Sequence, residues 1–154
     1  MEKIIYLGAD HNGWQLKNEL QLWLRDEGYK VVDLGPKEFD KSDDYPDYGF
    51  KVATAVATNP TNGLGILLCG SGAGMAVAAG KVAGVRAALM HDPKVARSAR
   101  QDDDINVLAL GAGFVDLATA KEVIKAWLET DYLGEARHVR RLDKIRNYEQ
   151  SHSQ

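Results

Sequence analysis

Short apolar runs alternate along the chain with longer segments in which apolar residues recur at helical spacing. The short runs predict buried strands over residues 4–7, 31–34, 64–68, 86–90 and 107–110. The longer segments predict helices over 14–27, 46–57, 76–82, 93–101, 117–128 and 135–148. Because strands alternate with helices, the pattern predicts an α/β fold with a parallel sheet covered on both faces.

Length and composition narrow the class of protein. The 154 residues suffice for one domain, which we expect over residues 1–150, followed by a short polar tail over 151–154. A net charge of −3 argues against a general nucleic-acid binder, and no apolar run is long enough to span a membrane. The single cysteine, Cys69, cannot form an internal disulfide, which favours a reducing compartment such as the cytoplasm.

Polar and glycine residues directly follow four of the predicted strands. In parallel sheets, ligands bind beyond the carboxyl ends of the strands. The stretches that lie there are 8–11, 69–74, 91–92 and 111–113. We therefore expect the functional groups of this chain in these four stretches.

The stretch 69–74, Cys-Gly-Ser-Gly-Ala-Gly, joins a strand to a helix through a glycine turn. This arrangement aims backbone N–H groups and a helix N-terminus at an anion. It lacks the lysine of a P-loop and follows the third strand, so an anion smaller than ATP or NAD is favoured. Cys69 is either a buried small apolar residue or a thiolate favoured by the turn. With no cysteine-protease motif beside it, general base is the preferred role of that thiolate.

Charged residues elsewhere allow several interpretations. Asp10 either caps the helix that follows, with His11 in solvent, or contacts substrate hydroxyls or phosphate together with His11. Arg137 and Arg141 share a helix face, which indicates a solvated helix, a two-arginine phosphate clamp or an RNA-binding tail. The lack of interleaved aromatic residues disfavours RNA. The acidic run 102–104 indicates a solvated turn or a local cap rather than a metal site, because three consecutive carboxylates cannot face one ion.

Six motifs follow the order and spacing of the type B ribose-5-phosphate isomerases, a family that includes the galactose-6-phosphate isomerase subunits. The chain resembles this family from Lys3 to about Glu149. The motifs are Gly-Ala-Asp-His (8–11), Asp-Tyr-Pro (44–46), Cys-Gly-Ser-Gly-Ala-Gly (69–74), Lys-Val-Ala-Gly-Val-Arg-Ala (81–87), Asn-Val-Leu (106–108) and Arg-His-Val-Arg-Arg (137–141).

The resemblance implies a Rossmann-like (flavodoxin-like) domain in three layers, with five parallel strands and a C-terminal helix that reaches a partner subunit. It implies an aldose–ketose isomerase that interconverts ribose 5-phosphate and ribulose 5-phosphate through a cis-enediolate, with no metal or other cofactor. The implied partner is a second copy of the chain, in a homodimer or a dimer of dimers. Its active sites would take residues from both subunits.

The resemblance also implies roles for particular residues. Cys69 would move a proton between C1 and C2, since Met75, which stands where some members have a glutamate base, cannot take a proton. Ser71 would shuttle a proton between O1 and O2, and the backbone amides of residues 70–74 would form an anion hole. The implied substrate contacts are Asp10, His11, Tyr45, Gly70, Gly72, Ala73, Gly74, Asp103, Arg137 and Arg141.

The chain departs from the family pattern at three positions. Asp102 stands where a histidine commonly opens the furanose ring, and we expect its carboxylate to accept the hydroxyl proton instead. Gly113 stands where an arginine commonly contacts phosphate, and Gly80 where an asparagine is common. These departures leave open another sugar, such as a hexose 6-phosphate, a tetrose phosphate or a free aldose. They also leave open a non-catalytic subunit that binds a sugar phosphate.

Overall fold

The computed structural model describes residues 2–153, which contain a five-stranded parallel sheet in the order β2-β1-β3-β5-β4. The strands are β1 (Ile4–Ala9), β2 (Lys30–Asp33), β3 (Gly63–Cys69), β4 (Ala87–Leu89) and β5 (Val107–Gly111). Within the described residues the helices are α1 (Trp14–Asp26), α2 (Tyr45–Thr58), α3 (Ala73–Ala79), α4 (Pro93–Asp103), α5 (Leu117–Leu128) and α6 (Ala136–His152).

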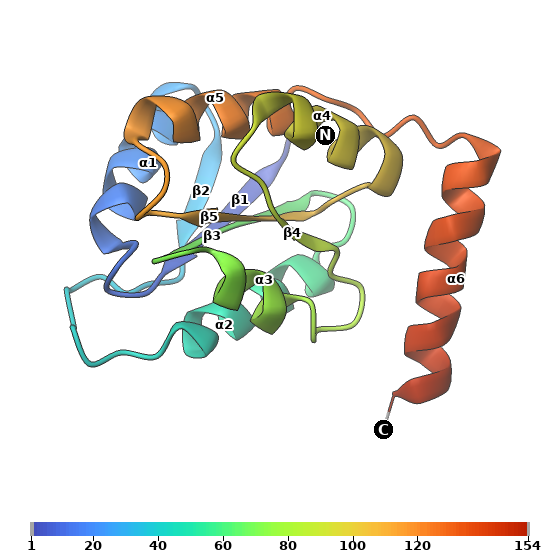
Figure 1. The fold of residues 1–154 in the computed structure, drawn as a ribbon, viewed down its shortest axis with the longest axis horizontal. Helices are drawn as coiled ribbons and strands as arrows, with labels where there is room; N and C mark the ends of the chain where they lie inside the picture. The colour runs from blue at the N-terminus through green and yellow to red at the C-terminus, as the bar shows by residue number, and fades with distance from the viewer. Residues whose placement is uncertain (1, 154) are drawn as a thin grey trace.

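Helices cover both faces of the sheet, which confirms the predicted three layers. Helices α1, α4 and α5 lie on one face, and α2 and α3 lie on the other (Figure 1). Successive residues of a strand point to opposite faces. Ile66 and Leu68 accordingly join the apolar cluster under α1, α4 and α5, whereas Leu67 and Cys69 join the cluster under α2 and α3. The alternation along β3 thus directs the thiol of Cys69 toward α2 and α3.

The strand order differs from that of flavodoxin at one edge of the sheet. There the fourth strand would follow the third, whereas here β5 lies between β3 and β4. All residues of β5 are buried, while the three residues of β4 are partly or largely exposed. The longer apolar strand thus occupies the inner position, where its side chains are covered on both faces.

A fully buried lysine ties α1 to the segment that follows β2. The ammonium of Lys17 donates hydrogen bonds to both carboxylate oxygens of Asp33, each at 2.9 Å, and to the carbonyl of Pro36 at 2.8 Å. A buried charge is tolerated when it is paired and its hydrogen bonds are satisfied. Lys17 meets both conditions and fixes the start of the long loop between β2 and α2.

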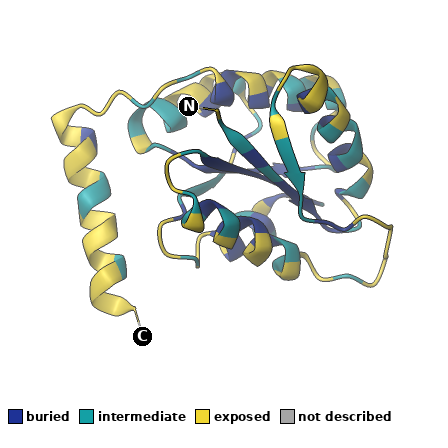
Figure 2. Cartoon of the chain, turned by 180° about the vertical axis from the view of Figure 1, so that it is seen from behind, coloured by how far each residue is buried: buried dark blue, intermediate teal, exposed yellow. Residues whose placement is uncertain are grey.

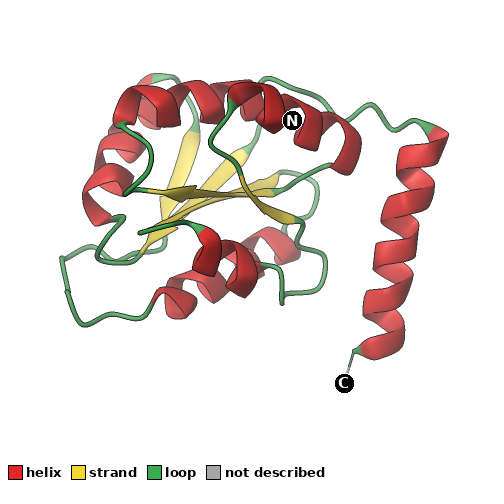
Figure 3. Cartoon of the chain, viewed as in Figure 1, coloured by secondary structure: helices red, strands yellow, loops and turns green. Residues whose placement is uncertain are grey.

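Helix α6 stands away from the three-layer body (Figures 1 and 3). His138 is its one buried residue among those described. Val139, Ile145 and Tyr148 are 41%, 51% and 66% exposed, and Figure 2 shows the helix as largely exposed. The apolar side chains of α6 therefore find little cover within a single chain.

Three helices differ from their predicted ranges by two residues or more. Helix α3 spans Ala73–Ala79 rather than 76–82, so it begins inside the glycine turn, and two other helices run farther than predicted. Helix α6 ends at His152 rather than Tyr148, so the first two residues of the expected polar tail are helical. Helix α4 ends at Asp103 rather than Gln101, so Asp102 lies in its last turn rather than in a loop. Asp104 follows with a φ of 48°, and its carboxylate pairs with Arg86 and Arg100. Among residues 2–153, no helix combines the length and apolar character needed to cross a membrane.

Candidate active site

The carboxyl ends of the strands meet at one edge of the sheet, as predicted. The N–H of Asp10 donates to the carbonyl of Leu68 at 3.1 Å, which joins the end of β1 to that of β3. The N–H of Gly113 donates to the carbonyl of Gly70 at 3.0 Å, which joins the loop after β5 to the glycine turn. The ring of His91, after β4, accepts the N–H of Gly111 at 3.0 Å. All four predicted stretches therefore contribute to this edge.

Cys69 is the last residue of β3 and is 4% exposed. Its Sγ accepts a hydrogen bond from the N–H of Gly72 at 3.2 Å. An N–H donor directed at sulfur stabilises the thiolate more than the thiol, because it interacts with the developing charge. The turn that follows Cys69 thus directs a backbone donor at the sulfur of the candidate base.

The glycine turn is folded closely against its surroundings. Gly72 has a φ of +80°, and a Cβ there would lie 2.6 Å from Cδ1 of Leu89. A Cβ on Gly74 would lie 2.7 Å from the ring of Tyr45. The exposed Ser71 accepts the N–H of Ala73 at 3.3 Å through its Oγ. Glycine is required at positions 72 and 74 because a side chain at either would collide with these neighbouring elements.

Asp10 is 5% exposed and holds the turn between β1 and α1. Its Oδ1 accepts the N–H of Asn12 at 2.9 Å and of Gly13 at 3.1 Å. Burial raises the pKa of Asp10, an effect that these two hydrogen bonds oppose in part. The carboxylate therefore has the capping role considered from the sequence, yet it lies at the same edge as Cys69.

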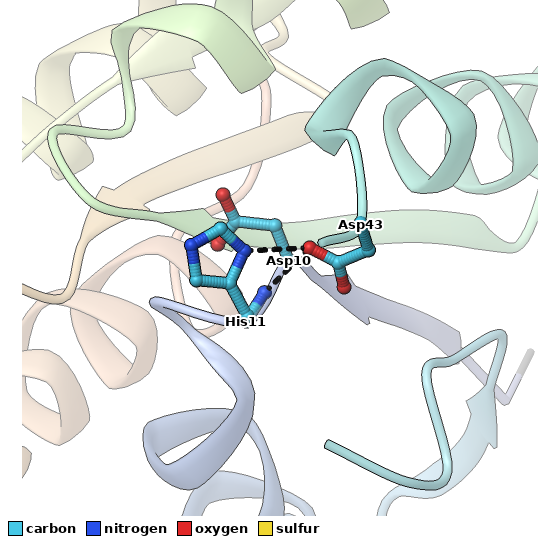
Figure 4. A group of neighbouring side chains, drawn as sticks. All are labelled: Asp10, His11 and Asp43. Atoms are coloured by element: carbon cyan, nitrogen blue, oxygen red, sulfur yellow. Dashed lines mark hydrogen bonds and ion pairs between the residues drawn. The ribbon is translucent and has the colours of Figure 1, made fainter. Parts of the chain in front are cut away.

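His11 is held by Asp43, a residue that the sequence analysis did not place in the site. Oδ1 of Asp43 accepts the backbone N–H of His11 at 3.0 Å and is 2.7 Å from its Nδ1 (Figure 4). The hydrogen bond to Asp43 raises the pKa of His11, and the neighbouring carboxylates act in the same direction. Phe39, from the same loop as Asp43, contacts the His11 ring edge to face.

Asp10, His11 and Asp43 place ligand atoms within 4.8 Å of one another, a spacing that a metal ion could bridge. In each carboxylate, however, Oδ1 already accepts backbone N–H groups, and Nδ1 of His11 faces Asp43. The arrangement is therefore better described as a hydrogen-bonded network than as a set of free ligands.

Tyr45 begins α2 and is 38% exposed. The close approach of its ring to Gly74 places it beside the glycine turn. Tyr45 thus joins Cys69, Ser71, Asp10 and His11 at the carboxyl edge of the sheet.

The other predicted site residues lie at the opposite edge. A helix that follows a parallel strand runs back across the sheet, so the last turn of α4, with Asp102 and Asp103, lies near the start of β5. Oδ1 of Asp102 is 3.7 Å from Nε2 of His138 in α6. The Nε of Arg137 donates to the same ring nitrogen at 3.2 Å, and its guanidinium pairs with Glu135 at 3.0 Å. Arg141 is exposed on the same helix.

Within one chain, therefore, Asp102, Asp103, Arg137 and Arg141 do not approach Cys69. His138 was not predicted as a site residue from the sequence. This residue is 3% exposed, and its Nδ1 has no hydrogen-bond partner among the described residues. Its contact with Arg137 places it beside the predicted phosphate clamp.

Comparisons with known proteins match the chain to sugar isomerases. Residues 5–145 match the model of a family described as Ribose/Galactose Isomerase. The chain is 45% identical over 145 residues to the probable ribose-5-phosphate isomerase B of Mycoplasma genitalium, covering 94% of this chain and 95% of that protein. It is 43% identical over 150 residues to ribose-5-phosphate isomerase B of Escherichia coli, covering 97% and 98% of the two chains.

A solved structure is similarly close. The crystal structure of ribose-5-phosphate isomerase B from Mycoplasma genitalium with bound ribulose-5-phosphate superposes with a TM-score of 0.93 at 44% identity. The superposition covers 97% of this chain and 98% of that one.

Proposed function

The chain belongs to the ribose/galactose isomerase family, and we propose that it interconverts ribose 5-phosphate and ribulose 5-phosphate through a cis-enediolate. The observation that carries this proposal is the hydrogen bond from the Gly72 amide to the sulfur of Cys69, inside a glycine turn that opens helix α3. A thiol and an anion-binding turn at one place suit a reaction that creates negative charge beside a transferable proton.

Cys69 performs the carbon proton transfer in this proposal. As a thiolate it removes the proton from C2 of the aldose, and the electron pair moves to the carbonyl to give the enediolate. The resulting thiol returns the proton to C1 and forms the ketose. No electron acceptor is required, because only protons and one double bond change position.

The turn and Ser71 stabilise the intermediate. Those amides of residues 70–74 that do not bond Cys69 or Ser71 face the oxygen that becomes negative, and removal of one such donor typically costs about 3 kcal/mol of transition-state stabilisation. The exposed hydroxyl of Ser71 moves a proton between O2 and O1 while Cys69 acts at the carbons. Asp10, His11 and Tyr45 bind the remaining polar groups of the sugar.

A second copy of the chain supplies the residues that one chain keeps at its far edge. Arg137 and Arg141 of the second copy bind the phosphate, and Asp102 and Asp103 act on the ring and its hydroxyls. The separation of these residues from Cys69 supports a homodimer, or a dimer of dimers, with shared sites. The exposed Ile145 and Tyr148 of α6 supply apolar surface for such an interface.

The assignment is tested with purified protein treated with a chelator. Ribose 5-phosphate should convert to ribulose 5-phosphate, and in deuterium oxide the proton at C2 should exchange with solvent. Binding of ribose 5-phosphate with neither conversion nor exchange would favour a non-catalytic subunit instead.

Gly113 favours a second candidate, an isomerase of the same mechanism acting on another sugar. A residue with a side chain at this position would approach the carbonyl of Gly70 to 3.1 Å, beside the anion-binding turn. Glycine leaves that space open and removes the phosphate contact that an arginine would provide. Rates on a hexose 6-phosphate, a tetrose phosphate and free ribose, compared with ribose 5-phosphate, separate the two candidates.

The buried, unpaired thiol of Cys69 supports a reducing location such as the cytoplasm.

A further inference from the structure

We propose that Asp43 is a positioning residue for His11: it fixes the imidazole with Nε2 available to the substrate and stabilises the cationic form of the ring through their ion pair. The inference rests on the proposed isomerase function, because the group that His11 receives is an anionic oxygen of the sugar phosphate. Asp43 itself acts only through His11.

The geometry fixes the orientation and the tautomer of His11. One oxygen of Asp43, Oδ1, accepts both the backbone N–H of His11 and its ring Nδ1–H. A carboxylate acceptor on Nδ1 requires a proton on that nitrogen. Nε2 lies on the side of the ring away from Asp43 (Figure 4) and has no hydrogen bond to the described residues. It is therefore the ring atom left for a ligand.

The burial of Asp43 requires a positive charge beside it. Its side chain is only 5% exposed, and Oδ2 is buried without a hydrogen-bond partner. A buried carboxylate in this condition is costly unless a cation compensates it. Among the residues described, His11 is its one partner in an ion pair. The carboxylate and the imidazolium thus stabilise each other.

The surrounding charges act in one direction. The charged groups that face His11 are the carboxylates of Asp10, Asp40 and Asp43. All three raise the pKa of His11, and the hydrogen bond to Asp43 is the largest contribution. The imidazolium therefore persists to higher pH than in an unpaired histidine, and it is lost as the pH rises through the raised pKa.

A cation is useful at this position. Two histidines lie at the carboxyl edge, and Nε2 of His91 already accepts the N–H of Gly111. Nε2 of His11 has no such partner among the described residues, so His11 is the histidine of this edge that is placed to meet an anion. Gly113 contributes no positive charge, and the two arginines of the predicted phosphate clamp lie at the opposite edge of the same chain. Asp43 thus stabilises a cation that this chain itself supplies beside the glycine turn.

Two substitutions separate charge from orientation. Asp43→Asn removes the negative charge but keeps an oxygen that can accept the Nδ1–H, whereas Asp43→Ala removes both. The matched control is Asp47→Asn, which removes one negative charge from the exposed first turn of α2 without facing His11. The readouts are the NMR titration and tautomer of His11, assigned with a His11→Gln variant, and the pH dependence of KM and kcat.

In Asp43→Asn, we expect the His11 titration midpoint to fall while the Nδ1–H tautomer is retained. KM for ribose 5-phosphate should rise by up to about tenfold at pH values above both His11 midpoints, and by less than about twofold well below both midpoints, where both proteins carry the imidazolium; kcat should change little. Asp43→Ala should raise KM at both pH values because the ring also loses its orientation. Asp47→Asn should match the wild type in all readouts.

The inference is overturned if the His11 midpoint is the same in Asp43→Asn and wild type, or if it falls while the KM profile stays unchanged. Absence of isomerase activity in the wild type would refute the proposed function separately. If the wild type is inactive, the Kd of inorganic phosphate, measured from the change in the His11 NMR signal on titration with phosphate, is compared in place of KM. In that case a pH-independent ratio between the two proteins would overturn the role of Asp43.

Discussion

The N–H of Gly72 donates a hydrogen bond to Sγ of Cys69 at 3.2 Å, across a turn that Gly72 closes with a φ of +80°. The left-handed backbone of one residue therefore determines which amide reaches the sulfur of the other. Because the same glycine also contacts β4 and β5 closely, the chemistry of Cys69 depends on the packing of the whole carboxyl edge.

Substitution Gly72→Ala should damage both folding and activity. The new Cβ would lie 2.6 Å from Cδ1 of Leu89 and 2.8 Å from the backbone of Leu110, which adds a steric clash to backbone strain. We expect a loss of about 2–4 kcal/mol in the free energy of unfolding, measured in urea. Gly84→Ala is the matched control: its φ is +85°, but nothing lies within 4 Å, so only about 1 kcal/mol should be lost. Equal losses in the two variants would contradict the packing argument.

Substitution of Cys69 should remove turnover and leave the fold intact. In Cys69→Ser a weaker base replaces the thiolate at nearly the same volume, and kcat should fall about a thousandfold, the range typical of a lost general base. The thermal unfolding midpoint should change little, because the hydroxyl can still accept the Gly72 N–H. Retention of full isomerase activity in Cys69→Ala would exclude the thiol as the base.

Shared active sites can be tested by mixing two inactive variants. Cys69→Ala removes the base, and the double variant Arg137→Ala/Arg141→Ala removes the phosphate ligands. If each site takes Cys69 from one copy and the arginines from the other, a hybrid dimer contains one intact site. Random reassociation of equal amounts should then restore about a quarter of wild-type activity. Recovery of no activity in verified hybrid dimers would indicate that the two groups of residues serve the same chain.

The burial of Asp10 predicts a pH dependence of stability. Its pKa is raised in the folded state, so the native protein holds this proton to higher pH than the unfolded chain does. The contribution of Asp10 to stability should therefore decrease as the pH rises from below about 3.9, the unfolded value, through the raised folded value. Asp10→Asn keeps the acceptor for Asn12 and Gly13 but does not titrate. Relative to wild type, it should gain stability as the pH rises from below the unfolded pKa of Asp10 through its raised folded pKa, measured by urea unfolding. A constant difference across this range would contradict the argument.

The layers of the fold and the carboxyl edge of the site could be predicted from local sequence. Residues 64–68 are apolar on both sides of the strand, which predicts a strand covered on both faces of the sheet. The glycines that follow indicate a turn. The end of α6 could not be predicted as well, because no glycine or proline follows Tyr148 to stop the helix. The inner position of β5 depends on packing between elements distant in the chain, and the alternation of strands and helices carries no information about it.

The site residues likewise divide into those whose place follows from local sequence and those whose place depends on contacts between distant parts of the chain. Asp10 and His11 directly follow β1, and Cys69 ends β3, so their place at the carboxyl edge follows from the topology. The contact between His11 and Asp43 joins residues 32 positions apart, one of which lies in a loop without periodicity. Asp102 was expected beside the substrate from the resemblance alone. A helix that returns from β4 must end at the far edge, so in one chain Asp102 lies away from Cys69.

The ion pair of Lys17 makes this residue an internal reporter of local opening. An amine-acylating reagent reacts with exposed lysines directly, whereas Lys17 is enclosed by Asp33 and Pro36 and has no contact with solvent. Its amine becomes reactive only in molecules in which α1 has separated from the segment after β2. Acylation of Lys17, followed over time by mass spectrometry, therefore measures how often this part of the folded protein opens.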